Sequence, residues 1–89
     1  MNLEECRKEI DRLDKELTNL LEQRMQVVAK VAAYKKENHM EIFDPRRERQ
    51  VLDKIAAMAQ YKELAPYLQK IYQCIMDESK NCEREYMKL

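Results

Sequence analysis

The stretch LEECRKEIDRLDKELTNLLEQRMQVVAKVAAYKK, residues 3–36, decides the fold of this chain. Its apolar side chains recur at alternating steps of three and four residues, the heptad spacing of one face of a long α-helix. The residues on this face, which we call the heptad face, are Leu3, Cys6, Ile10, Leu13, Leu17, Leu20, Val27, Val31 and Tyr34. We therefore predict a single helix that begins near Asn2 and packs through this face.

Two cations belong to the same side of this helix. Arg24 occupies a heptad position where Leu or Val is expected, and Lys35 follows three helical turns later on nearly the same face. An unpaired charge in a packed interface is unfavourable, so two such cations predict an anion beside them. The alternative is that both side chains reach the surface, or pair with acidic residues of another helix.

The length of the helix predicts how the chain assembles. A helix of about 34 residues is roughly 50 Å long, whereas a compact domain of this size has a diameter of about 30 Å. Part of the apolar face would extend beyond any globule that the chain could form alone. A second copy of the chain is the cover we expect, so we predict an intertwined homodimer.

Composition narrows the fold class and the possible partners. The 89 residues suit one domain, 1–89, and the absence of Gly with only two Pro is typical of an all-α protein. The 17 basic and 17 acidic residues balance, which argues against a nucleic-acid partner. No apolar run is long enough for a bilayer, and the acidic N-terminus does not resemble a signal peptide. We expect a cytoplasmic protein with no membrane partner.

The cysteines and the histidine do not predict a disulfide framework or a metal site. Cys6, Cys74 and Cys82 form an odd set without a Cys-x-x-Cys motif. The single histidine, His39, has no plausible metal partner near it in the sequence. We predict no metal and no cofactor.

Two shorter helices should follow the first. The first helix should end near Asn38, the best left-handed terminator in a chain without Gly. Asp44-Pro45 is a cap followed by a helix-starting proline, and predicts a second helix to about Ala59. Its inward face should hold Val51, Leu52, Ile55, Met58 and Ala59.

Pro66 should start the third helix after a short link over residues 60–65. Its inward face should hold Leu68, Ile71, Tyr72, Ile75 and Met76, and Ser79 and Glu83 continue the row Tyr72, Met76. Residues 84–89 are expected to be loose. The predicted architecture is three helices per chain, the first of them very long.

Seven polar residues fall on the inward faces: Arg7, Arg24, Lys35, Arg47, Glu48, Ser79 and Glu83. Four of them are cations, which predicts a small ligand with several negative charges. No nucleophile with a neighbouring base is apparent, so an enzyme built this way would act by positioning and charge stabilisation. Arg7 precedes Arg24 by 17 residues, about 25 Å along the helix. If both serve one site, Arg7 must come from a second chain running antiparallel.

These residues fall into four ordered motifs that resemble the all-helical chorismate mutases from Leu3 to about Glu83. The motifs are Arg7-x-x-Ile10-Asp11-x-x-Asp14-x-x-Leu17-x-x-Leu20-Leu21-x-x-Arg24, Val31-x-x-x-Lys35, Asp44-x-x-Arg47-Glu48 and Ile75-Met76-x-x-Ser79. The chain looks like a free-standing mutase domain without an attached dehydratase, dehydrogenase or synthase. The resemblance implies an isomerase of the shikimate pathway that converts chorismate to prephenate, toward phenylalanine and tyrosine, in an intertwined dimer.

The resemblance also implies a role for each site residue. Arg24 and the partner's Arg7 would bind the substrate carboxylates, and Lys35 would donate to the ether oxygen whose bond breaks. Arg47 would assist with a carboxylate and the developing charge, and Glu48 would hold the ring hydroxyl. The rim and secondary contacts would come from Asp44 and Ser79.

Glu83 occupies a position that is Gln in many members of the family and Glu in others. Glutamine donates to an ether oxygen at any pH, whereas glutamic acid donates only when protonated. We therefore expect turnover to fall as pH rises and Glu83 loses its proton.

Two other functions remain open from the sequence. One is the related lyase that removes pyruvate from isochorismate on the same scaffold, which also uses a cationic pocket and a lysine near the ether oxygen. The other is a non-catalytic helical dimer or ligand-sensing module, which would leave Arg24 on the heptad face without a purpose.

Overall fold

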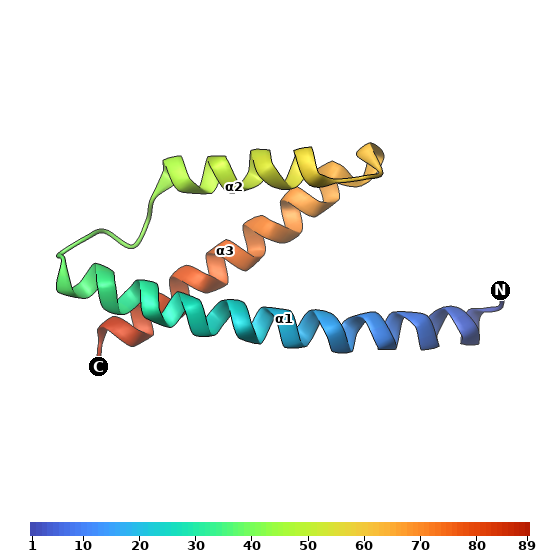
Figure 1. Ribbon diagram of the computed structural model, residues 1–89, viewed down its shortest axis with the longest axis horizontal. Coiled ribbons are helices and arrows are strands. Elements are labelled where there is room, and N and C mark those ends of the chain that lie inside the picture. The colour runs from blue at the N-terminus through green and yellow to red at the C-terminus, as the bar shows by residue number, and fades with distance from the viewer.

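The computed structural model describes all residues, 1–89, and contains helices and no strands (Figure 1). In chain order these are α1 (Leu3–Glu37), α2 (Pro45–Met58), the short 3-10 helix η1 (Lys62–Leu64) and α3 (Ala65–Met87). The prediction of an all-α chain with three helices, the first of them very long, is confirmed. No helix carries an apolar stretch sufficient for a membrane crossing.

The ends of α1 follow from local hydrogen bonds. Asn2 caps the helix, because its side-chain oxygen accepts from the Glu5 backbone N–H at 2.8 Å. The prediction that Asn38 is the left-handed terminator is wrong: the left-handed residue is His39, with φ of 55°. The Met40 N–H donates to the Lys35 carbonyl at 2.8 Å, which closes a Schellman turn around His39. The Asn38 side chain instead donates to a carbonyl of the preceding turn.

The starts of α2 and α3 are set by different means. The Asp44 carboxylate accepts from the Arg47 backbone N–H at 3.1 Å, and Pro45 begins α2 as predicted. Before α3 the link forms the 3-10 turn η1, so α3 begins at Ala65, one residue before the predicted Pro66. No side chain caps α3, and the 3-10 turn leads the backbone directly into it.

In space, α3 runs diagonally between the other two helices. Its first half packs against α2 and its second half against the C-terminal half of α1, while the N-terminal half of α1 extends away from both (Figure 1). The molecule measures 53 × 26 × 14 Å and has a radius of gyration of 15.9 Å. A compact chain of this length would have a radius near 12 Å, so α1 overhangs as its length predicted.

The single chain has almost no core of its own. Only five of its 89 residues are buried, and these are Ala32, Ala59, Met76, Ser79 and Glu83. Even Val27, Val31 and Tyr34, in the half of α1 that packs on α3, stay largely exposed. The part of α1 that faces α3 is instead Met25, Val28, Ala29 and Ala32. Most of the heptad face is therefore uncovered within one chain.

Three further expectations about the shorter helices are wrong. Ile71, expected on the inward face of α3, is 55% exposed. Met58, in the last turn of α2, is 69% exposed. Residues 84–89 are not a loose tail: α3 continues to Met87, and the Lys36 ammonium donates to the Leu89 backbone carbonyl at 2.9 Å. Glu83 therefore lies within α3, four residues before its end at Met87.

Candidate active site

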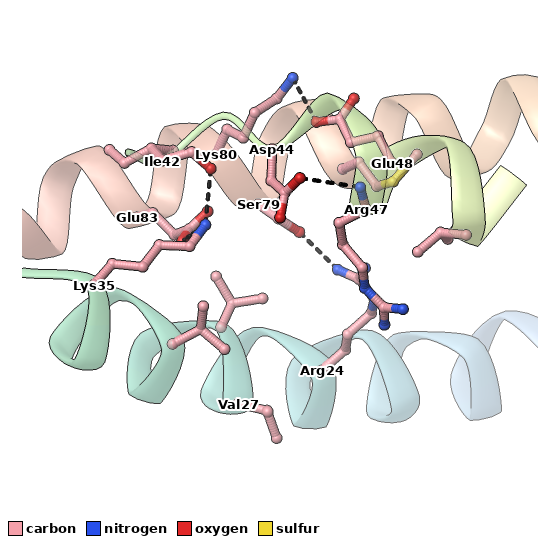
Figure 2. A pocket seen from close by; sticks show the side chains of 14 residues that line it. Arg24, Val27, Lys35, Ile42, Asp44, Arg47, Glu48, Ser79, Lys80 and Glu83 are labelled. Carbon is pink, nitrogen blue, oxygen red and sulfur yellow. Dashed lines mark hydrogen bonds and ion pairs between the residues drawn. The ribbon is translucent and has the colours of Figure 1, made fainter. Parts of the chain in front are cut away.

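A partly open cavity of about 410 Å³ lies where the three helices meet (Figure 2). This volume is in the range of small-molecule sites. Its apolar lining comes from Val27, Val28, Val31, Ile42, Val51 and Met76. Its polar lining consists of Arg24, Lys35, Asp44, Arg47, Glu48, Ser79, Lys80 and Glu83.

Each element places its polar residues by helical spacing. The C-terminal half of α1 contributes Arg24 and Lys35, three turns apart, and the first turn of α2 contributes Arg47 and Glu48. The buried side of α3 contributes Ser79 and Glu83, one turn apart, and Asp44 caps α2 at the rim. Seven of the eight predicted site residues thus line one cavity. The eighth, Arg7, lies on the free half of α1, away from this cavity.

Lys35 and Glu83 form an ion pair inside the cavity. The Lys35 Nζ lies 3.0 Å from Glu83 Oε1 and donates to the Ile42 backbone carbonyl at 2.8 Å. Both side chains are nearly buried, with exposures of 14% and 7%. The ammonium is off the hydrogen-bonding direction of Glu83 Oε1, which is left without a hydrogen-bond donor. The contact is therefore an ion pair without an aligned hydrogen bond.

The two arginines have no acidic partner. Arg24 donates to the Ser79 hydroxyl at 2.7 Å, and that hydroxyl donates to the Ile75 carbonyl at 2.7 Å. The Arg47 guanidinium makes no hydrogen bond or ion pair within the chain, although its backbone N–H is held by Asp44. Two planar guanidinium groups are therefore free to bind carboxylates in the forked geometry that arginine favours.

Glu48 is held by a residue that the sequence reasoning missed. Lys80 Nζ lies 2.9 Å from Glu48 Oε2, and Gln73 donates to Glu48 Oε1 at 3.2 Å. The hydrogen bond to Glu48 raises the pKa of Lys80, so the ammonium stays charged at neutral pH. Lys80 lies four residues after Met76 and three before Glu83, and this spacing on the inward face of α3 was the available signal.

The arrangement favours binding and positioning of a small anion. Four cations and three acids line the cavity, and each acid already has a partner in the chain. The Ser79 hydroxyl is held by Arg24 and a backbone carbonyl and has no base beside it. No group of three His, Cys, Asp or Glu side chains is placed to hold a metal ion. The cavity can therefore stabilise negative charge but has no activated nucleophile.

Comparison with known proteins relates the chain to one enzyme family. Residues 6–84 match the family model described as chorismate mutase type II. A bifunctional chorismate mutase/prephenate dehydratase of Buchnera aphidicola (subsp. Acyrthosiphon pisum) is 32% identical over 83 residues, which are 92% of this chain and 22% of that protein. A protein of the same name from Aquifex aeolicus is 40% identical over 53 residues, or 60% of this chain and 15% of that protein.

A shorter relative matches along most of its length. The chorismate mutase of Methanocaldococcus jannaschii is 28% identical over 86 residues, which are 96% of this chain and 87% of that protein. The chain thus spans about a fifth or less of the two bifunctional relatives and most of the archaeal one.

Proposed function

The chain belongs to the chorismate mutase type II family, and from that premise we propose that it is an isomerase that rearranges chorismate to prephenate in aromatic amino acid biosynthesis. The observation that carries this proposal is the cavity itself. Arg24 and Arg47 present guanidinium groups free of acidic partners, and Lys35 presents an ammonium to the same cavity. Such a set suits a substrate with two carboxylates and an ether oxygen.

The proposed mechanism uses positioning rather than covalent chemistry. An intramolecular rearrangement needs no acid, base or nucleophile, only a compact substrate conformer and fixed donors where charge develops. Arg24 and Arg47 would hold carboxylates at one end of the cavity. At the other end, Lys35 would donate to the ether oxygen as its bond to the ring breaks and negative charge grows there.

Glu83 would complete the contact to the ether oxygen. In the structure Glu83 is 5% exposed and lies beside Lys35. An ionised carboxylate would repel the growing charge on the ether oxygen, whereas the protonated form donates a hydrogen bond to it. If Glu83 is the second donor, Lys35 must leave its ion pair with Glu83 to reach the substrate.

The remaining site residues would hold the periphery of the substrate. Glu48 has lone pairs left after its contacts with Lys80 and Gln73, and would accept from the ring hydroxyl. Ser79 orients Arg24 through the 2.7 Å hydrogen bond between them. Asp44, at the N-cap of α2, positions the backbone of Arg47 at the rim.

We further propose that two chains form an intertwined dimer, in which the partner's Arg7 enters this cavity. The free half of α1 exposes Leu13, Leu17 and Leu20, and nothing in the chain covers them. Arg7 is about 25 Å from Arg24 along one helix, so a single chain cannot bring both to one small ligand. An antiparallel second α1 would cover the leucines and bring the partner's Arg7 to the cavity.

The domain extent and the cellular location stay predictions. The match over residues 6–84 supports a single domain over residues 1–89. A cytoplasmic location rests on the sequence.

The function is tested by adding chorismate to the purified protein and following the absorbance of chorismate. A second assay adds isochorismate and measures the release of pyruvate. Appearance of prephenate supports the mutase. Release of pyruvate from isochorismate without prephenate formation would instead identify the related lyase. If neither product forms while chorismate still binds, the protein is a binding module and the proposed activity is wrong.

A further inference from the structure

Two hydrogen bonds and two ion pairs join four side chains into a closed ring between α2 and α3. Gln73 donates to Glu48 Oε1 at 3.2 Å and to Asp77 Oδ1 at 3.0 Å. Lys80 Nζ lies 2.9 Å from Glu48 Oε2 and 3.3 Å from Asp77 Oδ1, and it sits 4.7 Å from the centre of the Phe43 ring. Three members of the ring come from α3, and only Glu48 comes from α2. We call this set the Glu48 ring.

The ring holds both oxygens of Glu48 from the same side. Figure 2 shows the Glu48 carboxylate directed toward Lys80, while Arg24 and Arg47 lie on the other side of the cavity. An ionised carboxylate has about four lone-pair sites, of which the ring occupies two. The others remain available to a substrate hydroxyl. The orientation of Glu48 is thus set by α3 and not by its own helix.

The ring also keeps one acid away from the cations of the cavity. Asp44 is engaged as the α2 cap and Glu83 with Lys35, so Glu48 is the remaining carboxylate that could neutralise a guanidinium. Glutamate has a flexible side chain, and Glu48 lines the same cavity as Arg24 and Arg47. If it paired with either one, it would occupy the group that a substrate carboxylate needs.

We propose that Lys80 is a positioning residue, which holds the Glu48 carboxylate against α3 and thereby keeps Arg24 and Arg47 free for the substrate. The kinetic consequences of this inference rest on the proposed function. The position of Glu48 rests only on the geometry of the Glu48 ring. Without Lys80, the carboxylates of Glu48 and Asp77 would face each other across Gln73 alone. Their repulsion would drive Glu48 into the cavity, toward the guanidinium groups.

The charges of Asp77 and Lys80 persist through the neutral pH range. Hydrogen bonds from Gln73 and then Lys80 lower the pKa of Asp77, and the hydrogen bond to Glu48 raises that of Lys80. Because the Lys80 pKa is raised, the stability that its charge adds to the fold is fully present below the ordinary lysine pKa. This stability is lost only as pH rises past the pKa in the folded state. Because the Asp77 pKa is lowered, the stability that its charge adds to the fold is present above the ordinary aspartate pKa. This stability is lost as pH falls through the pKa in the folded state.

The kinetic test replaces Lys80 while keeping the length of its side chain. Lys80→Met should raise KM more than it lowers kcat, since the displaced Glu48 competes with substrate carboxylates. The loss in kcat/KM should be about 10- to 100-fold, the scale for removing one partner of a charged hydrogen bond. Lys80→Arg should restore most of it. Lys88→Met, at an exposed lysine that pairs with Glu85, is the matched control and should leave both constants unchanged.

A double variant separates positioning from a structural role. In a Glu48→Gln background no carboxylate remains to be held, so adding Lys80→Met should cause little further loss. If Lys80→Met costs the same factor in both backgrounds, or if kcat alone falls, Lys80 does not act through Glu48 and the proposal is overturned. Circular dichroism and thermal unfolding of each variant check that the helices are intact.

A spectroscopic test is independent of catalysis. The Nε signals of ¹⁵N-labelled arginine can be assigned with Arg24→Lys and Arg47→Lys. In Lys80→Met the signal of Arg24 or Arg47 should shift as Glu48 pairs with it, and the shift should be absent in Lys80→Met/Glu48→Gln and in Lys88→Met. If neither arginine signal moves in Lys80→Met, the inference fails whether or not the protein is a mutase. If the signal moves but wild type forms no prephenate, Glu48 positioning stands and the proposed function fails.

Discussion

The two halves of α1 share one heptad pattern but differ in what surrounds them. In the N-terminal half, residues 3–23, Leu17 and Leu20 are 54% and 60% exposed and no other element packs on them. In the C-terminal half, residues 24–37, Ala32 is 1% exposed against α3 and the cavity opens beside it. The same spacing therefore predicts which residues share a face, but not which part of the molecule covers that face.

The difference also divides the proposed site. Arg24 and Lys35 lie on the packed half and reach the cavity of their own chain, whereas Arg7 lies on the free half and does not. If the free half packs on a second chain, both halves serve catalysis in different subunits.

A charge on the free half should have the largest effect. Leu17→Glu should abolish the two-chain species and most folded helix, because each leucine buried in a dimer stabilises it by about 1.5–3 kcal/mol and a buried charge reverses this. Sedimentation at micromolar concentration and circular dichroism measure both effects. Asn19→Glu, on the opposite side of the helix, is the control and should remain dimeric. A stable, compact wild-type monomer would rule out the dimer and the shared site.

Complementation between two inactive variants tests whether the halves act across subunits. Arg7→Ala and Arg24→Ala should each lose on the order of 100-fold or more in turnover, since each removes a charge-bearing contact. Refolded together, they should form heterodimers with one intact and one doubly damaged site. Random pairing should restore about a quarter of the wild-type sites. Verified heterodimers that stay inactive would show that Arg7 is structural or serves its own chain.

Truncation of Lys35, on the packed half of α1, should lower turnover without changing the fold. Lys35→Ala should keep the wild-type helix content and lose on the order of 100-fold in kcat, the scale for removing one preorganised donor. Lys36→Ala is the matched control, because the Lys36 ammonium contacts only the Leu89 carbonyl at the surface. Near-normal turnover in Lys35→Ala would exclude Lys35 from the site.

Replacement of Glu83 should change the shape of the pH profile more than its maximum. Wild-type turnover should fall as pH rises, because the protonated, donating form of Glu83 becomes scarce. Glu83→Gln donates at every pH, so it should flatten this limb and keep activity at neutral and alkaline pH, while Glu83→Ala should be poor throughout. Turnover is measured from acid to mildly alkaline pH with the folded state checked at each point. Superimposable profiles for wild type and Glu83→Gln would mean that Glu83 is not the donor.

Local sequence signals predicted the helices and most of the candidate site. Asn2 and the Asp44-Pro45 pair form the expected caps, and Arg24, Lys35, Ser79 and Glu83 reach the cavity from the expected faces. These predictions depend on helical periodicity and on hydrogen bonds between near neighbours. Both are properties of short segments, so they do not depend on how the rest of the chain packs.

Some of the wrong or missed predictions concern residues whose positions are determined by contacts between segments distant in the sequence. Lys80 was missed because its role depends on Glu48, 32 residues earlier in the chain, and that pairing exists only once α2 packs on α3. The C-terminal residues are held partly by Lys36, in the last turn of α1 and 53 residues before Leu89 in the chain. The left-handed turn is a different, local case: it falls on His39, one residue after Asn38, whose side chain donates to the Tyr34 carbonyl four residues earlier.

By itself, the sequence determined that the chain is helical, where α1 and α2 begin, and that cations and acids recur on the inward faces. Side-chain spacing and capping are encoded within a few turns. Only the tertiary structure decided which acid pairs with which cation. The crossing of α3 over α1 and α2 engages Glu83 with Lys35 and Glu48 with Lys80, and leaves Arg24 and Arg47 without an acidic partner. Charge pairing depends on distances of a few ångströms between helices, and no spacing along one helix contains that information.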